Sequence, residues 1–118
     1  MGCGRYLREK NPDIEIIAVQ PSTPSHGLIG LKHMKSVTQP AIYDANFPDS
    51  MIEIDTEDAS KMVRRLAREE GLFVGISSGA AALAALKKAE NLEEAFIVTI
   101  FPDAGFKYIS DTALWGDQ

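Results

Sequence analysis

The 118-residue sequence lacks several features that would place it in a common class of protein. It has one cysteine, Cys3, so no disulfide can form within the chain, and this is typical of a reducing compartment. No apolar run reaches the ~18 residues of a membrane-spanning helix. The first residues have no apolar region of a secretory signal. These absences predict a cytoplasmic protein with no membrane partner, in which Cys3 is a small buried packing residue rather than a nucleophile.

An excess of positive charge is also missing. The chain has 12 Lys and Arg residues against 17 Asp and Glu residues, a net charge of −5. Its charge balance therefore does not indicate binding of nucleic acid. No repeat or low-complexity segment occurs, and we predict no metal site. What remains is an ordinary globular composition, 45% hydrophobic and 25% charged, long enough for one domain with a modest core.

Strand and helix patterns alternate along the chain. A first helix is predicted over 1–9, because proline disfavours helical geometry in the residue before it and Pro12 follows. Runs rich in β-branched residues predict strands at 14–20, 51–54 and 95–101. Apolar patterns predict helices at 56–70 and 78–89. We expect the three strands to form one parallel sheet with the two later helices packed on it.

Local signals mark the ends of these elements. Asp55 and Thr56 are expected to cap the helix at 56–70, and Gly71 is expected to end it. Residues 28–50 show no sustained period, which predicts a long ordered connection.

The stretch 72–81 is the part of the sequence around which the other elements are interpreted. It predicts a short buried strand at 72–74, a bend at Gly75 and the start of a helix. Ser77 or Ser78 can cap that helix by accepting a hydrogen bond from a free amide, or can offer a hydroxyl to a ligand. Residues 102–105 follow another predicted strand, so both turns would lie at the same edge of a parallel sheet and form one crevice.

Four sequence motifs resemble one family, the cysteine synthases (O-acetylserine sulfhydrylases). Residues 75–81, GISSGAA, resemble the family's GISSGA segment. Residues 2–7, GCGRYL, are similar to the G-x-x-R-Y-[LI] helix that follows its phosphate-binding loop. Residues 17–21, IAVQP, match a strand written A-V-E-P in many members. Residues 101–110, FPDAGFKYIS, are similar to P-[SD]-x-G-x-[RK]-Y-[LI]-S, although Phe106 stands where a polar residue is common.

The resemblance implies an α/β fold, with residues 1–118 forming the carboxyl-terminal part of the large domain of a pyridoxal-phosphate fold type II enzyme. This part is a three-layer, tryptophan synthase β-like fragment with a mostly parallel sheet, and the amino-terminal domain is not included. The resemblance also implies cofactor-binding roles. Ser77 would hydrogen-bond the pyridine nitrogen, and Pro102 and Asp103 would line the ring edge. In the weakly matching stretch, Gly30 and Leu31 would come closest to the substrate.

Other motifs of that family do not occur here. No lysine lies in the context of the family's Schiff-base lysine, so we assign no catalytic residue and expect no bound pyridoxal phosphate and no activity from this chain alone. The complete enzyme would be a homodimer that makes cysteine from O-acetylserine, a small amino-acid substrate, and sulfide by β-replacement. Two alternatives stay open: the same fold with cystathionine β-synthase or serine/threonine dehydratase chemistry, or a non-catalytic α/β binding module.

Overall fold

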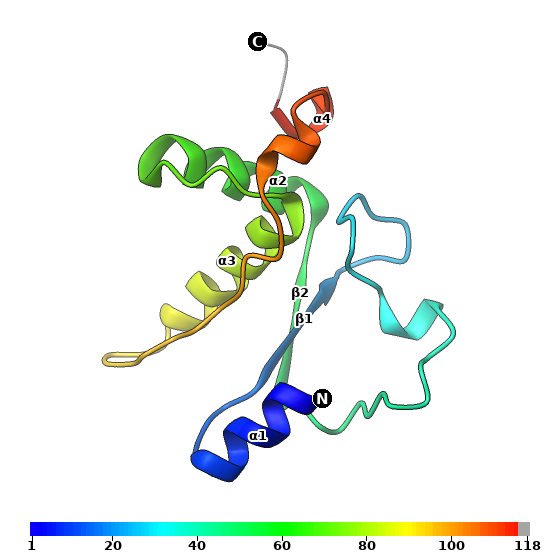
Figure 1. Cartoon of the computed structure of the whole chain (residues 1–118), viewed down its shortest axis with the longest axis vertical. Coiled ribbons are helices and arrows are strands. Elements are labelled where there is room, and N and C mark those ends of the chain that lie inside the picture. Colours follow the sequence, from blue (N-terminus) through cyan, green and yellow to red (C-terminus); the bar gives the residue numbers. More distant parts are fainter. Residues whose placement is uncertain (116–118) are drawn as a thin grey trace.

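The computed structural model describes residues 1–115, which form a small parallel sheet flanked by helices (Figure 1). Strand β1, Ile17–Pro21, pairs in parallel with β2, Ser50–Ile54, with Ile17 opposite Ser50 and Pro21 opposite Ile54. The predicted parallel pairing of the first two strands is therefore confirmed, although β1 begins later than residue 14. Helix α1, Gly2–Lys10, also matches its prediction and ends at Asn11, just before Pro12.

Alternate residues of the strands face opposite sides of the sheet. Val19 and Ile52 are opposite one another and pack on the core that includes Ala80 of helix α3, Ile76–Ala89. Their neighbours Ala18 and Met51 line a cavity on the side of α1. Figure 1 shows α2 and α3 on one side of the strands. The α/β fold class is thus confirmed.

Helix α2, Thr56–Arg65, continues as a π-helical turn, Leu66–Glu70, and ends where Gly71 adopts a left-handed φ of 66°. This confirms both the helix and its predicted terminal glycine. The two long helices pack very closely, because a Cβ atom on Gly79 would lie 2.5 Å from the Ala59 carbonyl oxygen and from Val63 Cγ2. Glycine is therefore required where α3 crosses α2.

The side-chain caps predicted for the amino ends of α2 and α3 do not form. The residue that precedes α3 is Gly75, whose carbonyl oxygen accepts bonds from the amides of Ser78 and Gly79 at 3.1 and 3.2 Å. Ser77 lies within the first turn and does not cap it. Asp55 does precede α2, but its carboxylate accepts a bond from the Ser22 hydroxyl and does not cap the helix.

Two predicted strands do not form. Within residues 1–115 the sheet contains only β1 and β2, and the segment 95–101 runs extended without strand pairing. A strand needs a neighbouring backbone for its hydrogen bonds, and no described strand lies beside this segment. Phe96, Val98 and Ile100 are 95%, 77% and 73% exposed. At 72–74 only Val74 forms a bridge, antiparallel to Ala104, and the predicted buried strand there was also wrong.

Two further observations concern the single cysteine and the length of the helices. Cys3 is exposed on α1, so the expectation of a buried cysteine was wrong. None of the helices within residues 1–115 is long and apolar enough to cross a membrane.

Candidate functional site

Two segments distant in sequence meet at the amino end of α3. The backbone amide of Gly75 donates to the Asp103 carbonyl at 3.1 Å, and the amide of Gly105 donates to the Phe73 carbonyl at 3.0 Å. The Ser78 hydroxyl adds a bond to the same Asp103 carbonyl at 3.4 Å. The predicted convergence of the Ser77 turn with the 102–105 turn is therefore confirmed. We call this meeting point the Gly75–Asp103 junction.

Ser77 and Ser78 differ in their surroundings. Ser78 is fully buried and its hydroxyl bonds to the junction, whereas Ser77 retains 8% of its surface. Both lie in the first turn of a 14-residue helix, where backbone amides and the helix dipole favour an acceptor or a negative charge. Ser77 is therefore the better placed of the two to offer a hydroxyl to a ligand.

The Asp103 side chain is mostly buried, with 17% of its surface exposed. Its Oδ2 atom accepts a hydrogen bond from the Tyr108 hydroxyl at 2.5 Å and lies 3.8 Å from Lys107 Nζ. Its Oδ1 atom is buried and has no hydrogen-bond partner among the described residues. One carboxylate oxygen is therefore held firmly while the other is left unsatisfied.

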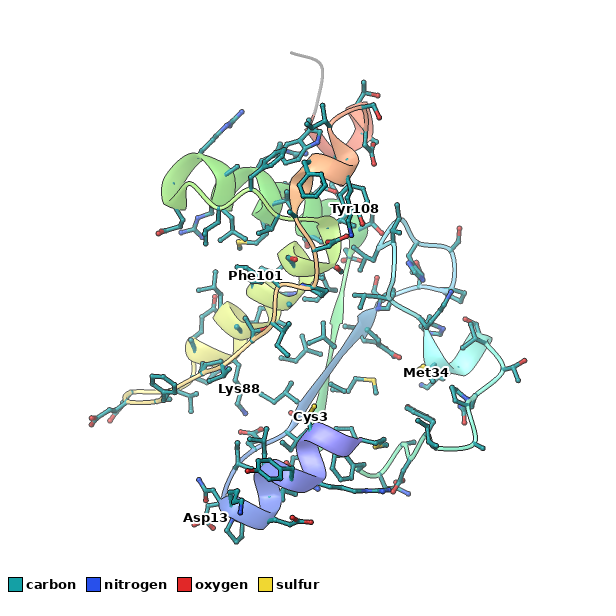
Figure 2. All side chains as sticks on the ribbon, viewed as in Figure 1. Cys3, Asp13, Met34, Lys88, Phe101 and Tyr108 are labelled. Atoms are coloured by element: carbon teal, nitrogen blue, oxygen red, sulfur yellow. The ribbon has the colours of Figure 1, made fainter. Side chains whose placement is uncertain are left out.

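The hydrogen bond to Asp103 raises the pKa of Tyr108, and burial and the negative charge of Asp103 raise it further. Each of these effects disfavours the ionised phenolate. Tyr108 therefore stays a neutral donor at physiological pH. Figure 2 shows Tyr108 near the amino end of α3.

Gly75 makes the close approach of these groups possible. A Cβ atom at this position would lie 2.1 Å from Asp103 Oδ1 and 2.8 Å from Tyr108 Cε2. Atoms cannot approach so closely, so any other residue would push the carboxylate and the ring away from the turn.

The five sequence-predicted site residues separate into two places. Pro102 is exposed and adjoins Asp103, so these two residues and Ser77 lie around the junction. Gly30 and Leu31 instead line a cavity of about 360 Å³ between α1, β1 and the connection that follows β1. Ser77, Pro102 and Asp103 do not line that cavity. Gly30 has a φ of 94°, which favours glycine.

The sequence did not reveal the part played by Tyr108. It lies in the segment 101–110, but five residues after Asp103, a spacing with no regular helical or strand period. The glycine at 105 and the 3-10 turn Gly105–Tyr108 bring the two side chains together. Lys107 and Tyr108 follow Asp103 closely, with Gly105 between them. This short pattern is the sequence signal from which a contact with Asp103 could be inferred.

Residues 1–103 match the family of pyridoxal-phosphate dependent enzymes. The chain belongs to this family. A member that it resembles is the cysteine synthase of Aquifex aeolicus, which is 48% identical over the whole chain. The chain covers 37% of that protein, and thus spans just over a third of its length.

Solved structures of family members have the same fold. Cysteine synthase (OASS) from Entamoeba histolytica superimposes with a TM-score of 0.88 and 37% identity, covering 99% of this chain and 37% of that one. The O-acetylserine dependent cystathionine β-synthase from Helicobacter pylori gives a TM-score of 0.81 and 35% identity, over 92% of this chain and 38% of that one. The fold is therefore that of a little over a third of each of these enzymes.

Proposed function

We propose that this chain is the carboxyl-terminal part of a cysteine synthase, which makes L-cysteine from O-acetylserine and sulfide by β-replacement. The observation that carries the proposal is the Gly75–Asp103 junction, which holds the GISSGA turn against the Pro-Asp turn. The 48% identity to the Aquifex aeolicus cysteine synthase supports the same reaction.

The residues at the junction fit the edge of the cofactor ring that carries the nitrogen. In this proposal the Ser77 hydroxyl hydrogen-bonds the pyridine nitrogen, while Pro102 and Asp103 line the ring edge. The buried, unpartnered Oδ1 atom of Asp103 and the small Gly75 beside it support this placement. Pyridoxal phosphate supplies the electron-withdrawing ring that makes β-replacement possible. A neutral serine holds a proton on the ring nitrogen less strongly than a carboxylate, which suits elimination of a β-substituent.

Gly30 and Leu31 are proposed to approach the substrate. Their cavity is separate from the junction in the part of the chain that the structure describes. In the complete enzyme the substrate would reach from the ring toward this connection. The proposal therefore places ring binding and substrate binding on different segments of this chain.

The chain supplies only part of an active site. None of its lysines lies in the context of the family's Schiff-base lysine, so we propose that residues 1–118 alone bind no pyridoxal phosphate and have no activity. The complete enzyme would be a homodimer, and a cytoplasmic location is part of the proposal because the single cysteine suits a reducing compartment.

A second candidate function has a specific observation in its favour. The Helicobacter pylori structure is a cystathionine β-synthase that depends on O-acetylserine, and its identity to this chain is close to that of the cysteine synthase structure. Both reactions replace the acetoxy group and differ in the nucleophile. The product, cysteine or cystathionine, distinguishes the two candidates.

A chimera tests the proposal. The matching third of the Aquifex aeolicus cysteine synthase is replaced by residues 1–118, and the folded product is assayed for pyridoxal phosphate binding and for cysteine formation. We expect both to be retained, with the unaltered Aquifex enzyme as the control. Formation of cystathionine alone would favour the second candidate. A folded chimera that binds no cofactor would contradict both and would favour a non-catalytic binding module.

A further inference from the structure

Tyr108 contacts both sides of the Gly75–Asp103 junction. Its hydroxyl donates to Asp103 Oδ2 at 2.5 Å. Its ring lies so close to the turn that a Cβ atom on Gly75 would be 2.8 Å from Cε2. The tyrosine therefore fixes the side chain of Asp103 and covers the backbone that leads to Ser77.

Tyr108 is itself held in place by the residues that follow it. Its carbonyl oxygen accepts bonds from Trp115 Nε1 at 2.7 Å and from the Asp111 amide at 3.0 Å. The Trp115 ring stacks on Phe73 with ring centroids 4.9 Å apart. Because Phe73 lies two residues before Gly75, the segment 108–115 contacts the turn through both Tyr108 and Trp115. Tyr108 is thus held by hydrogen bonds both at its side chain and at its backbone carbonyl.

The surroundings of the Asp103 carboxylate do not favour the stability of the folded chain. Its Oδ1 atom is buried without a partner among the described residues and faces Gly75. Lys107 is 55% exposed and lies 3.8 Å from the other oxygen, so it compensates little of this cost. Unsatisfied buried oxygens are rare in native proteins, and each requires an explanation. A role in shaping the turn below Ser77 provides one.

We propose that Tyr108 is a positioning residue of the cofactor site, a role that rests on the proposed function. Its hydroxyl holds the Asp103 carboxylate against Gly75, and this fixes the turn from which Ser77 reaches the pyridine nitrogen. Tyr108 acts through these residues and touches neither substrate nor cofactor. Because its pKa is raised, the phenol stays protonated at physiological pH and can donate this bond.

The first test measures the contact in the 118-residue chain. Ionisation of its three tyrosines is followed by ultraviolet absorbance as pH rises. We expect Tyr108→Phe to remove the component that ionises at the highest pH, and Asp103→Asn to move that component to lower pH. Tyr6→Phe, which changes an exposed tyrosine on α1, is the matched control and should leave it in place. Persistence of the highest component in Tyr108→Phe would overturn the assignment.

The second test measures coupling to Ser77 in the chimera. The dissociation constant for pyridoxal phosphate is determined for Ser77→Ala, Tyr108→Phe and the double variant, each with its fold checked by circular dichroism. We expect about a tenfold loss of affinity in Tyr108→Phe, and little further loss when it is added to Ser77→Ala. A merely structural role predicts additive losses, and an effect no larger than that of Tyr6→Phe would also overturn the proposal.

An alternative variant and the unmutated chimera distinguish failure of the proposed function from failure of the role given to Tyr108. If Tyr108→Phe does not fold, Trp115→Phe, which removes the Nε1 bond to the Tyr108 carbonyl, takes its place in the same cycle, and we again expect little further loss when it is added to Ser77→Ala. If the unmutated chimera binds no cofactor, the proposed function fails and the positioning role fails with it. If it binds the cofactor but shows no coupling, only the role of Tyr108 is lost.

Discussion

At the scale of single residues, Ser77 makes the sharpest prediction. In the chimera, Ser77→Ala should slow turnover by about 10- to 100-fold, because losing one buried hydrogen bond costs roughly 1–3 kcal/mol. Its melting temperature should change little, since Gly75 rather than Ser77 precedes α3. Steady-state kinetics and thermal melting are measured on the same variant.

Ser78→Ala is the matched control for that experiment. Ser78 is fully buried and donates to the Asp103 carbonyl, so its removal should lower the melting temperature instead. If Ser77→Ala destabilised the fold and left turnover of the folded enzyme normal, the cofactor role of Ser77 would be wrong.

Asp49 makes a prediction about pH. Its carboxylate accepts bonds from the Ile16 amide and from Arg8, each at 2.7 Å, and chiefly the first of these lowers its pKa below the ordinary 3.8. A lowered pKa contributes stability that is fully present above the ordinary aspartate pKa and is lost as pH falls through the folded value. Asp49→Asn should therefore lower the urea midpoint of the 118-residue chain at neutral pH, and the difference should shrink in acid.

Asp13→Asn, another exposed aspartate change, is the control for charge alone. If the difference in urea midpoint between the wild-type chain and Asp49→Asn stayed constant as pH fell into the acid range, the role given to Asp49 would be wrong.

The sequence allowed part of the candidate site to be predicted. The meeting of the turns around Ser77 and Asp103 was predicted because each lies in a short motif, while the cofactor roles of these two residues stay predictions. The Tyr108 contact was not predicted, because it depends on how the turn after Asp103 folds. The orphaned Oδ1 atom of Asp103 was also beyond prediction, since burial of one atom depends on packing from distant segments.

At the scale of elements, the segment 95–101 carries the main prediction. We expect it to pair as a strand in the chimera, where the rest of the enzyme can supply a neighbouring backbone. Amide hydrogen exchange should be slow there in the chimera and fast in the 118-residue chain. Helix α3 is the internal reference, because its bonds are made within the chain in both. Equal exchange of the segment in both proteins would refute this prediction.

Whether an element was predicted correctly depends on how far apart in the sequence its interacting residues lie. Helices α1, α2 and α3 were predicted because their hydrogen bonds and apolar faces repeat within a few residues. The pairing of β1 with β2 was predicted from β-branched runs and from the alternation of strand and helix patterns. The run at 95–101 is at least as rich in β-branched residues as β1, but strand formation requires a partner that composition does not reveal.

At the scale of the whole molecule, the described chain is less compact than a self-sufficient domain. Its radius of gyration is 15.1 Å. A compact domain of this length would have roughly 13.5 Å. Two-stranded parallel sheets are also too small to bury both faces well. These properties agree with a chain that spans just over a third of its cysteine synthase relatives.

The proposal that this chain holds only part of the cofactor site predicts how the isolated chain behaves with the cofactor. Mixed with pyridoxal phosphate, residues 1–118 should show no visible absorbance from a Schiff base at a defined lysine, because the family's lysine motif does not occur here. Borohydride reduction followed by mass spectrometry identifies any labelled position, and scattered surface labelling is the expected background. Stoichiometric labelling of one lysine would overturn the proposal that the cofactor site of this chain is incomplete.

The exposed row formed by Phe96, Val98 and Ile100 also has a consequence for solubility. Residues 95–101 contain no charge, proline or glycine and are rich in β-branched and aromatic side chains, the composition of segments that self-associate into cross-β aggregates. The chain produced alone should therefore precipitate as its concentration rises. A lysine at position 98, Val98→Lys, should keep it in solution, since a charge on an open strand edge opposes edge-to-edge association.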